Sequence, residues 1–239
     1  MTNAVSGFGT ILIWNYNRLL EMTSISGPSQ SRDTIDVTSH DSTDKFREFI
    51  AGPASGGEVS VEGNLIIEDE LGQMNFYDDL QAGTKRKVWI VLPMDTGAAM
   101  TFDALPTSFS PSNPYEDKIG VSLAMQITGK PVLYTTQSAG ITGLTGIEET
   151  GSAALTITPT IAAGTYRYAC TVDPDSDWIK LTVTAAGTIK VNGVMQTSGT
   201  QGAEISLNPA GETTDVFIMV FETSKSPRLY VLTVTRPEV

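Results

Sequence analysis

The sequence predicts a mainly β protein made of two domains. Short apolar runs that alternate with polar residues recur along the chain, and Gly, Pro, Asn and Ser separate them. Glycine and proline are frequent, at 22 and 12 residues, whereas strong helix signals are few. With 239 residues, the chain is long enough for two domains of ordinary size.

The first part of the chain carries most of the longer strand signals. Residues 58–64 show the pattern most clearly, because Val59 and Val61 alternate with Glu58, Ser60, Glu62 and Asn64. Such alternation is typical of a strand with one buried and one exposed face. The further strands that we expect in this part are residues 9–14, 33–38, 87–92, 100–105 and 119–128.

Two short helices are expected beside these strands. The first begins at Asp41 or Ser42, whose side chains suit an N-cap, and ends before Gly52-Pro53. Its apolar residues fall at helical spacing, so we expect them to pack on the sheet: Phe46, Phe49 and Ile50. The second helix is predicted over residues 73–80, with its end at Gly83.

The composition changes between residues 135 and 152, where Thr, Ser, Gly and Ala replace the periodic pattern. We therefore predict a first domain over residues 1–137, a linker over 138–152 and a second domain over 153–239. The second domain holds about seven short strand signals and no helix signal, which is typical of an immunoglobulin-like β-sandwich. These signals lie at residues 155–157, 166–172, 179–184, 188–191, 204–207, 215–221 and 229–235.

Charge and composition disfavour several classes of function. The net charge is −12, which disfavours a protein that binds nucleic acid by neutralising phosphates. One cysteine and one histidine exclude an internal disulfide and a Cys/His zinc site within one chain. No basic residue precedes Arg18, and the apolar run at 11–14 is short, so we expect neither an export signal nor a membrane span. Charged residues make up only 18%, which suggests a surface covered by partners.

No group of residues supports catalysis or metal binding, so we expect no enzyme activity and no cofactor. His40, Asp41 and Ser42 are adjacent, whereas a catalytic triad gathers its members from separate segments. Residues 173–177 imitate the start of a calcium loop but lack its later glycine and glutamate, so an acidic turn is the better interpretation. Cys170 is expected to be a small buried core residue.

Three ordered segments resemble the major tail tube proteins of long, non-contractile-tailed, lambda-like bacteriophages. They read IDVTSHDSTDKFREFIAG, GGEVSVEGN and TFDALPTSFSPSNPYEDKIGVSLAMQITGKP, and the resemblance covers roughly residues 1–135. It implies a tail-tube β-barrel or sandwich with one or two short flanking helices, and six copies per ring. Stacked rings would form a hollow tube that encloses the tape measure protein and conducts DNA during infection.

The resemblance also implies the partners and the location of the protein. Besides its own copies and the tape measure protein, these are the tail terminator and distal tail proteins, with DNA passing through without sequence-specific binding. No membrane partner is implied, and the protein would be made in the host cytoplasm and reside in the virion tail.

The C-terminal part, with runs such as ITPTIAAGTYRYACTV and IKLTVTAAGTIKVNGV, resembles the cadherin-like or immunoglobulin-like domains appended to phage structural proteins. This resemblance implies a place on the outside of the tube. The alternative function is a surface adhesin or host-binding module that acts through this sandwich.

Two charged groups are candidates for a role in such an assembly. Glu58 and Glu62 lie on one face of a predicted strand, which either lines the tube lumen or is an ordinary solvated face. In the lumen, their repeated negative charge would keep DNA from adhering to the wall. Lys85, Arg86 and Lys87 form the only basic cluster, which we expect to pair with acidic residues of a neighbouring subunit or to stay solvated.

Overall fold

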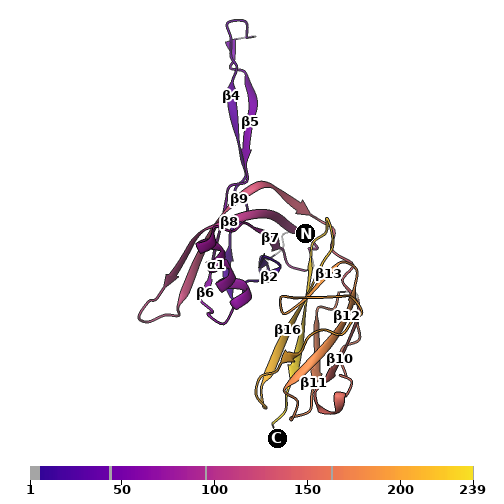
Figure 1. The fold of residues 1–239 in the computed structure, drawn as a ribbon. Coiled ribbons are helices and arrows are strands. Elements are labelled where there is room, and N and C mark those ends of the chain that lie inside the picture. Colours follow the sequence, from indigo (N-terminus) through magenta and orange to yellow (C-terminus); the bar gives the residue numbers. More distant parts are fainter. Residues whose placement is uncertain (1–5, 43–44, 95, 163, 239) are drawn as a thin grey trace. The chain divides into compact units, whose positions relative to one another are not determined.

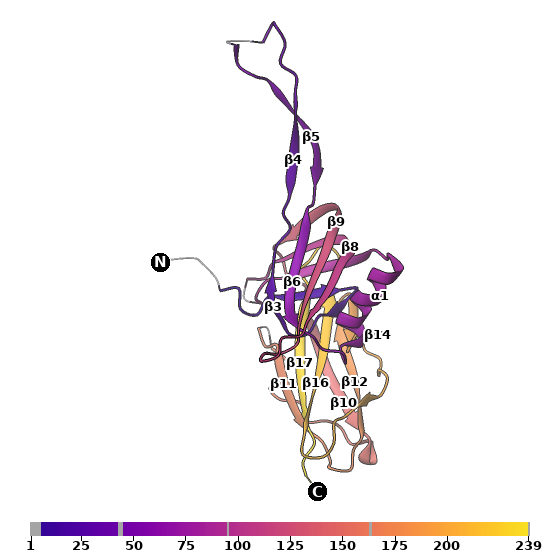
Figure 2. The same cartoon turned by 90° about the vertical axis from the view of Figure 1, so that its left-hand side faces the viewer.

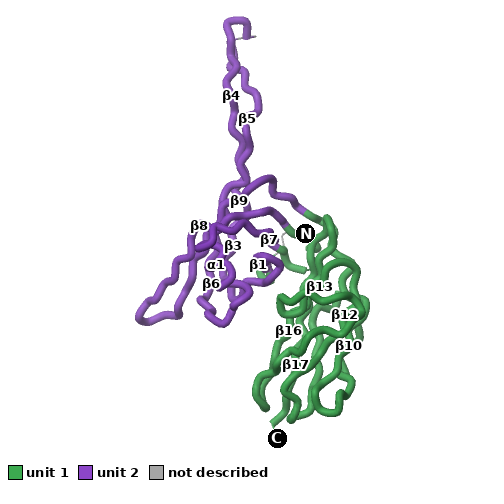
Figure 3. Tube along the Cα trace, viewed as in Figure 1, with its two compact units in different colours: residues 1–9, 91–99, 134–239 green, residues 10–90, 100–133 purple. Residues whose placement is uncertain are grey.

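The structure is a computed structural model that describes residues 6–42, 45–94, 96–162 and 164–238. It divides into two compact units, shown in two colours in Figure 3. The first-domain unit comprises residues 10–90 and 100–133, and the second-domain unit comprises 1–9, 91–99 and 134–239. Strands make up 51% of the structure and helices 7%, which confirms the mainly β prediction.

A curled seven-stranded sheet forms the first-domain unit (Figures 1 and 2). Its strand order is β2-β1-β7-β8-β9-β6-β3, so β2 and β3 are its two edge strands. The strands are β1 (Ile11–Trp14), β2 (Asn17–Arg18), β3 (Met22–Ile25), β6 (Glu58–Asn64), β7 (Arg86–Val91), β8 (Ala99–Ser112) and β9 (Gly120–Tyr134).

Alternating residues of these strands build the core of this unit. On β6, Val59 and Val61 are fully buried, whereas Glu58, Ser60 and Glu62 are exposed, as the sequence predicts. Leu12 and Trp14 of β1, Phe102 of β8, and Leu123 and Met125 of β9 join the same cluster. Over β6 and the first half of β9, one face of the sheet is therefore apolar and covered and the other is polar, whereas β1 and residues 88–91 of β7 are buried on both faces.

The second predicted helix is confirmed as α1 (Asn75–Ala82), which follows a π-helical turn, η2 (Glu70–Met74). It ends at Gly83, whose φ of 62° is left-handed, and the Gly83 N–H donates to the carbonyl oxygens of Asp79 and Leu80. Phe76 is fully buried and its ring lies 4.7 Å from that of Trp14. The helix thus packs on the apolar face through Phe76.

A buried carboxylate ties α1 to two strands. Asp79 is 3% exposed and accepts a hydrogen bond from Trp14 Nε1 at 2.8 Å. The Arg86 guanidinium of β7 binds the same carboxylate through Nε at 2.9 Å and Nη2 at 2.7 Å. The hydrogen bonds that the guanidinium donates to the Asp79 carboxylate raise the pKa of Arg86. The network fixes the position of the helix because each buried polar group in it has a partner.

The first predicted helix is wrong, because a two-stranded arm stands in its place. β4 (Ser31–Asp36) and β5 (Phe49–Ser55) pair as a separate two-stranded sheet, and β5 leads into the start of β6 (Figure 1). We call residues 31–55 the arm. Ile35 faces Ile50 across it. A nine-residue helix is marginal without packing, whereas pairing with β4 satisfies the backbone of β5.

The residues expected to cap that helix form a turn instead. Ser42 Oγ accepts from the Ser39 N–H at 3.0 Å, and Ser39 Oγ accepts from the Asp41 N–H at 3.2 Å. Short hydroxyl side chains bind the backbone in turns as readily as at helix starts. The predicted helix also included residues 43–44, which lie outside the described residues.

The second-domain unit contains a β-sandwich of two sheets, ordered β10-β12-β15 and β11-β17-β16-β13-β14. The predicted linker at 138–152 is wrong in part, because β10 lies within it and pairs with β12 from Ile141 to Glu148. The elements are β10 (Ile141–Glu148), η3 (Thr150–Ser152), β11 (Arg167–Thr171), β12 (Trp178–Ala185), β13 (Thr188–Val191), β14 (Val194–Gln196), β15 (Ile205–Ser206), β16 (Thr213–Phe221) and β17 (Arg228–Thr235).

We predict that Asp79→Ala lowers the free energy of unfolding by about 2–4 kcal/mol, because it leaves the buried Trp14 N–H and the Arg86 guanidinium without their shared acceptor. Urea unfolding followed by tryptophan fluorescence measures the change. The control is Asp78→Ala, which removes an exposed carboxylate from the same helix and should cost less than about 0.5 kcal/mol. Equal effects of the two variants would contradict the role of Asp79.

A second prediction concerns Cys170, which is 5% exposed in the sandwich core as expected. Burial, together with the charge of Glu148, raises the pKa of its thiol to about 11. At pH 8 only about one thiol in a thousand is ionised. Iodoacetamide should therefore label Cys170 at least about a hundredfold more slowly in native buffer than in denaturant, as mass spectrometry can measure. Rapid native labelling would contradict the buried position.

Candidate functional site

The exposed face of β6 continues onto both neighbouring strands and forms a polar surface. In the antiparallel register, Glu58 lies opposite Gln126 of β9, and Glu62 lies between Ser122 of β9 and Ser24 of β3. Glu58 and Glu62 are about 13 Å apart along the strand. We call this surface, made by residues 24, 58, 60, 62, 122 and 126, the polar face. It carries two carboxylates among short polar side chains, and its position in a lumen stays a prediction.

The predicted basic cluster is divided by the strand that carries it. Arg86 turns inward to its bidentate ion pair with Asp79, so the prediction of an inter-subunit role is wrong for this residue. Lys87 points to the other side of the sheet, where its Nζ lies 3.7 Å from a carboxylate oxygen of Asp103. Lys85 is exposed just before the strand. Alternation along β7 therefore places Arg86 and Lys87 on opposite sides of the sheet.

The arm exposes the apolar residues that we expected to pack under a helix. Phe46 is 75% exposed, and Phe49 and Ile50 are each 53% exposed, so the packing prediction is wrong within one subunit. Ile35 and Val37 of the arm are also exposed. Isolated two-stranded hairpins are only marginally stable, and exposed apolar patches commonly mark protein contacts. The arm is therefore a candidate interaction surface.

The two edge strands provide a second kind of contact surface. The strand order places β2 at one end of the curled sheet and β3 at the other, and within the described residues each pairs with one strand only. An edge strand presents a row of backbone donors and acceptors that can pair with another chain. The outer side of β3 is thus available for strand addition, whereas the two-residue β2 lies beside η2.

A buried polar network, which the sequence analysis missed, holds the loop between β6 and α1. The Asp69 carboxylate accepts from the backbone N–H groups of Leu20 and Gln73 at 3.1 and 3.0 Å. The Gln73 side chain donates to Leu20 O and Asn64 O and accepts from the Ile66 N–H. Burial raises the pKa of Asp69, which these hydrogen bonds partly offset. The only signal of this network in the sequence was an aspartate followed four residues later by a glutamine.

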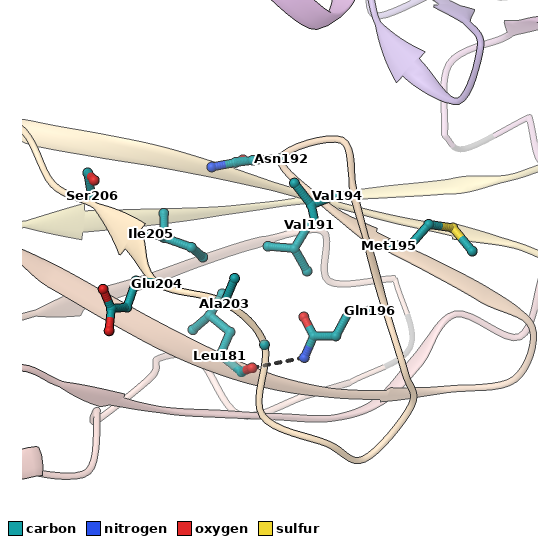
Figure 4. Close-up of a pocket in the computed structure, with 11 residues that line it drawn as sticks. Leu181, Val191, Asn192, Val194, Met195, Gln196, Ala203, Glu204, Ile205 and Ser206 are labelled. Atoms are coloured by element: carbon teal, nitrogen blue, oxygen red, sulfur yellow. Dashed lines mark hydrogen bonds between the residues drawn. The ribbon is translucent and has the colours of Figure 1, made fainter.

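A pocket of about 290 Å³ opens between the sheets of the sandwich (Figure 4). The β13–β14 hairpin forms one wall, including Val194 and Met195, and β12 with the segment before β15 forms the other. Gln196 Nε2 donates to Leu181 O at 2.9 Å and joins the two walls. The residues that line the pocket are Leu181, Val191, Asn192, Val194, Met195, Gln196, Gly202, Ala203, Glu204, Ile205 and Ser206.

The acidic turn at residues 173–177 is held by hydrogen bonds within the chain. Asp173 Oδ1 accepts from the Asp175 N–H at 3.0 Å, and the Glu149 carboxylate accepts from the Asp177 N–H at 2.8 Å. Within the described ranges, no three His, Cys, Asp or Glu side chains gather where they could hold a metal ion. No described helix is long and apolar enough to cross a membrane.

Comparison with known proteins gives two family matches and several similar structures. Residues 20–133 match the model of the phage tail tube protein family, and residues 152–237 match that of the cadherin-like β-sandwich domain. No curated protein sequence matches the chain.

Each of the similar structures covers about half of the chain. The tail of an empty GTA particle, refined with C6 helical symmetry, has 22% identity over 54% of this chain and 98% of its own, with a TM-score of 0.45. The virion of the native gene transfer agent particle has 21% identity over the same shares, with the same TM-score. A sheath/tube terminator of an extracellular contractile injection system has 15% identity over 56% of this chain and 98% of its own, again at 0.45.

The two family matches correspond to the curled sheet and to the sandwich. The curled sheet with its helix and arm lies largely within residues 20–133, and the sandwich lies largely within 152–237. The chain therefore carries a phage tail tube protein domain over residues 20–133, followed by a cadherin-like β-sandwich domain over residues 152–237.

Proposed function

We propose that this protein is a structural virion subunit that polymerises as stacked hexameric rings to form a phage tail tube. The observation that carries the proposal is the match of residues 20–133 to the tail tube family, together with a sheet whose two edge strands each pair with one strand only. The ring number of six follows from the resemblance of the sequence to lambda-like tail tube proteins. The function then exists only in the assembly.

Joining of sheets between subunits closes each ring. The β3 edge of one copy approaches the β2 edge of the next, so that the curled sheets continue around the lumen. Backbone pairing of this kind supplies affinity, and the side chains beside it select the register. This contact is heterologous, and a heterologous contact generates a ring when its rotation closes.

The arm contributes an apolar contact to a neighbouring subunit. Its five exposed apolar residues, Ile35, Val37, Phe46, Phe49 and Ile50, are costly to leave in water, and their burial on assembly stabilises the tube. The aromatic pair is suited to a central role because aromatic side chains dominate many interfaces. These side chains are exposed within one subunit, and in the assembly they pack against a neighbouring subunit.

The polar face lines the lumen in this proposal. Glu58 and Glu62 repeat with every copy, so each ring presents a band of carboxylates to the passing DNA. Like charges repel, and the effect is largest in a narrow channel, where field lines are focused. The serine and glutamine side chains opposite them are uncharged and leave the carboxylates without a cationic partner across the strands. DNA would pass without sequence-specific binding, after release of the enclosed tape measure protein.

The remaining partners are the tail terminator and distal tail proteins at the two ends of the tube. Subunits are made in the host cytoplasm and act in the virion tail. The cadherin-like domain lies on the outside of the tube. Its pocket of about 290 Å³ favours a second candidate function for this domain, the binding of a host-surface component as an adhesin.

We predict that the purified protein forms hollow tubes or six-membered rings in negative-stain micrographs, and that Ile35→Ser with Ile50→Ser abolishes them. These side chains face each other on the arm and are about half exposed, so the double variant should fold normally yet lose the contact. Circular dichroism checks the fold, and sedimentation measures the polymerised fraction.

The matched control changes the adjacent cross-strand pair, with Thr34→Ser and Ala51→Ser, and should polymerise as the original protein does. Uniform monomers of the original protein under all conditions would contradict the proposed function. Tubes formed equally well by both variants would contradict only the contribution of the arm.

A second prediction tests the lumen. Because Cys170 is buried, one introduced cysteine reports its own accessibility. In assembled tubes, Glu62→Cys should react with a small maleimide but not with a maleimide on a polymer wider than the lumen. Ala210→Cys, in the cadherin-like domain, is the control and should react with both reagents. Equal reaction of Glu62→Cys with the large reagent would place the polar face outside the tube.

A further inference from the structure

The β8–β9 hairpin projects well beyond the rest of the curled sheet. β8 ends at Ser112 and β9 begins at Gly120, so residues 113–119 form the turn between them (Figure 1). The Leu65 N–H donates to Ile119 O at the last residue of this turn, and the residues before Ile119 lie past the region paired with β6. We call residues 113–119 the hairpin tip. Tyr115 at its centre is fully exposed, and the exposed carboxylates of Glu116 and Asp117 follow it. Within the described residues, neither carboxylate forms an ion pair.

An open depression of about 600 Å³ lies at the base of the arm, beside the second half of β9. Its charged side chains are both cationic, Arg32 from β4 and Lys130 from β9. Arg32 Nη1 donates to Gly52 O at 3.2 Å, which holds the guanidinium against the arm. Neither cation has a carboxylate partner among the residues that the structure describes. Gly129 leaves space here, because no atom lies within 4 Å of the place where a Cβ would stand.

The hairpin tip and the depression are at opposite ends of one strand. Gly120 and Lys130 are ten residues apart on β9, which corresponds to about 33 Å in an extended strand. Figure 1 shows the hairpin extending away from the arm, so one subunit cannot bring its own tip to its own depression. A head-to-tail arrangement of two copies does bring them together, as any heterologous contact joins different patches of one molecule.

We propose that the hairpin tip of one copy docks in the depression of a second copy in the adjacent ring. Glu116 and Asp117 pair with Arg32 and Lys130, and the Tyr115 ring covers the apolar wall at Ile127. This inference rests on the proposed function, since it names the surfaces through which the rings stack. The match is one of charge, because the exposed tip carries Glu116 and Asp117 beside a single lysine, Lys118, whereas both charged side chains of the open depression are cationic.

The charged residues of this contact contribute more to the rotational register between adjacent rings than to the affinity between them. Exposed ion pairs are weak singly, but like charges placed together are penalised, so a ring rotated away from this register loses the contact. Tyr115 supplies the apolar part of the contact, because an aromatic side chain can bury about 150–250 Å². Repetition around a ring multiplies both effects, since every copy carries one tip and one depression.

Charge reversal of the full-length protein tests the proposal. Glu116→Lys with Asp117→Lys is the tip variant, and Arg32→Glu with Lys130→Glu is the depression variant. Each should raise the critical concentration for tube formation at least about tenfold, because like charges then face each other. In an equimolar mixture of the two variants, half of the possible contacts between a tip and a depression join opposite charges. The variant that carries all four changes restores every contact, so its tubes should form near the original concentration.

The readouts are the sedimented fraction over a concentration series and the appearance of tubes in negative stain. Glu212→Lys, an exposed charge reversal in the cadherin-like domain, is the control and should polymerise as the original protein does. If the original protein and both reversal variants form tubes at the same concentration, the docking contact alone is overturned. The same holds if the variant with all four changes does not regain tube formation. Absence of tubes from the original protein would overturn the proposed function and this contact together.

Discussion

The open edges of the curled sheet are the constraint on which the rest of this structure depends. The sheet ends in β2 and β3, and within the described subunit each of these strands pairs with one strand only. Soluble proteins usually cover such edges or close the sheet into a barrel, because exposed edges pair indiscriminately. In the proposed ring, these edges pair with neighbouring copies, and the buried core behind them holds the curl of each sheet.

Two buried polar networks hold the helix and the loop that pack against this sheet. Asp79 anchors α1 through Trp14 and Arg86, while the Asp69–Gln73 network fixes the loop that leads into the helix. Both networks satisfy buried polar groups, the first beside the apolar face and the second between the β2–β3 connection and the end of β6. The apolar face is therefore occupied within the subunit, and the polar face, the arm and the edges are left for contacts.

Sequence patterns predicted the elements whose signals are local. The alternation in residues 58–64, the end of α1 at Gly83 and the burial of Cys170 all appear as expected. The same reasoning was wrong for residues 41–50, where capping residues and helical spacing suggested a helix. It was also wrong for the linker, because a segment rich in small residues holds β10. For Arg86, adjacency to two lysines hid an ion pair with a residue seven positions earlier.

The sequence by itself determined the β character, the two-domain order and the side of β6 on which each residue lies, because a period of two and a left-handed glycine are properties of neighbouring residues. Only the tertiary structure decided the arm, since Ile35 and Ile50 meet through a pairing that no local spacing specifies. It also decided that Arg86 turns inward and that the hairpin tip and the cationic depression lie at opposite ends of β9. Strand pairing and side-chain orientation of this kind depend on contacts between residues that are distant in the sequence, and these contacts form only when the chain folds.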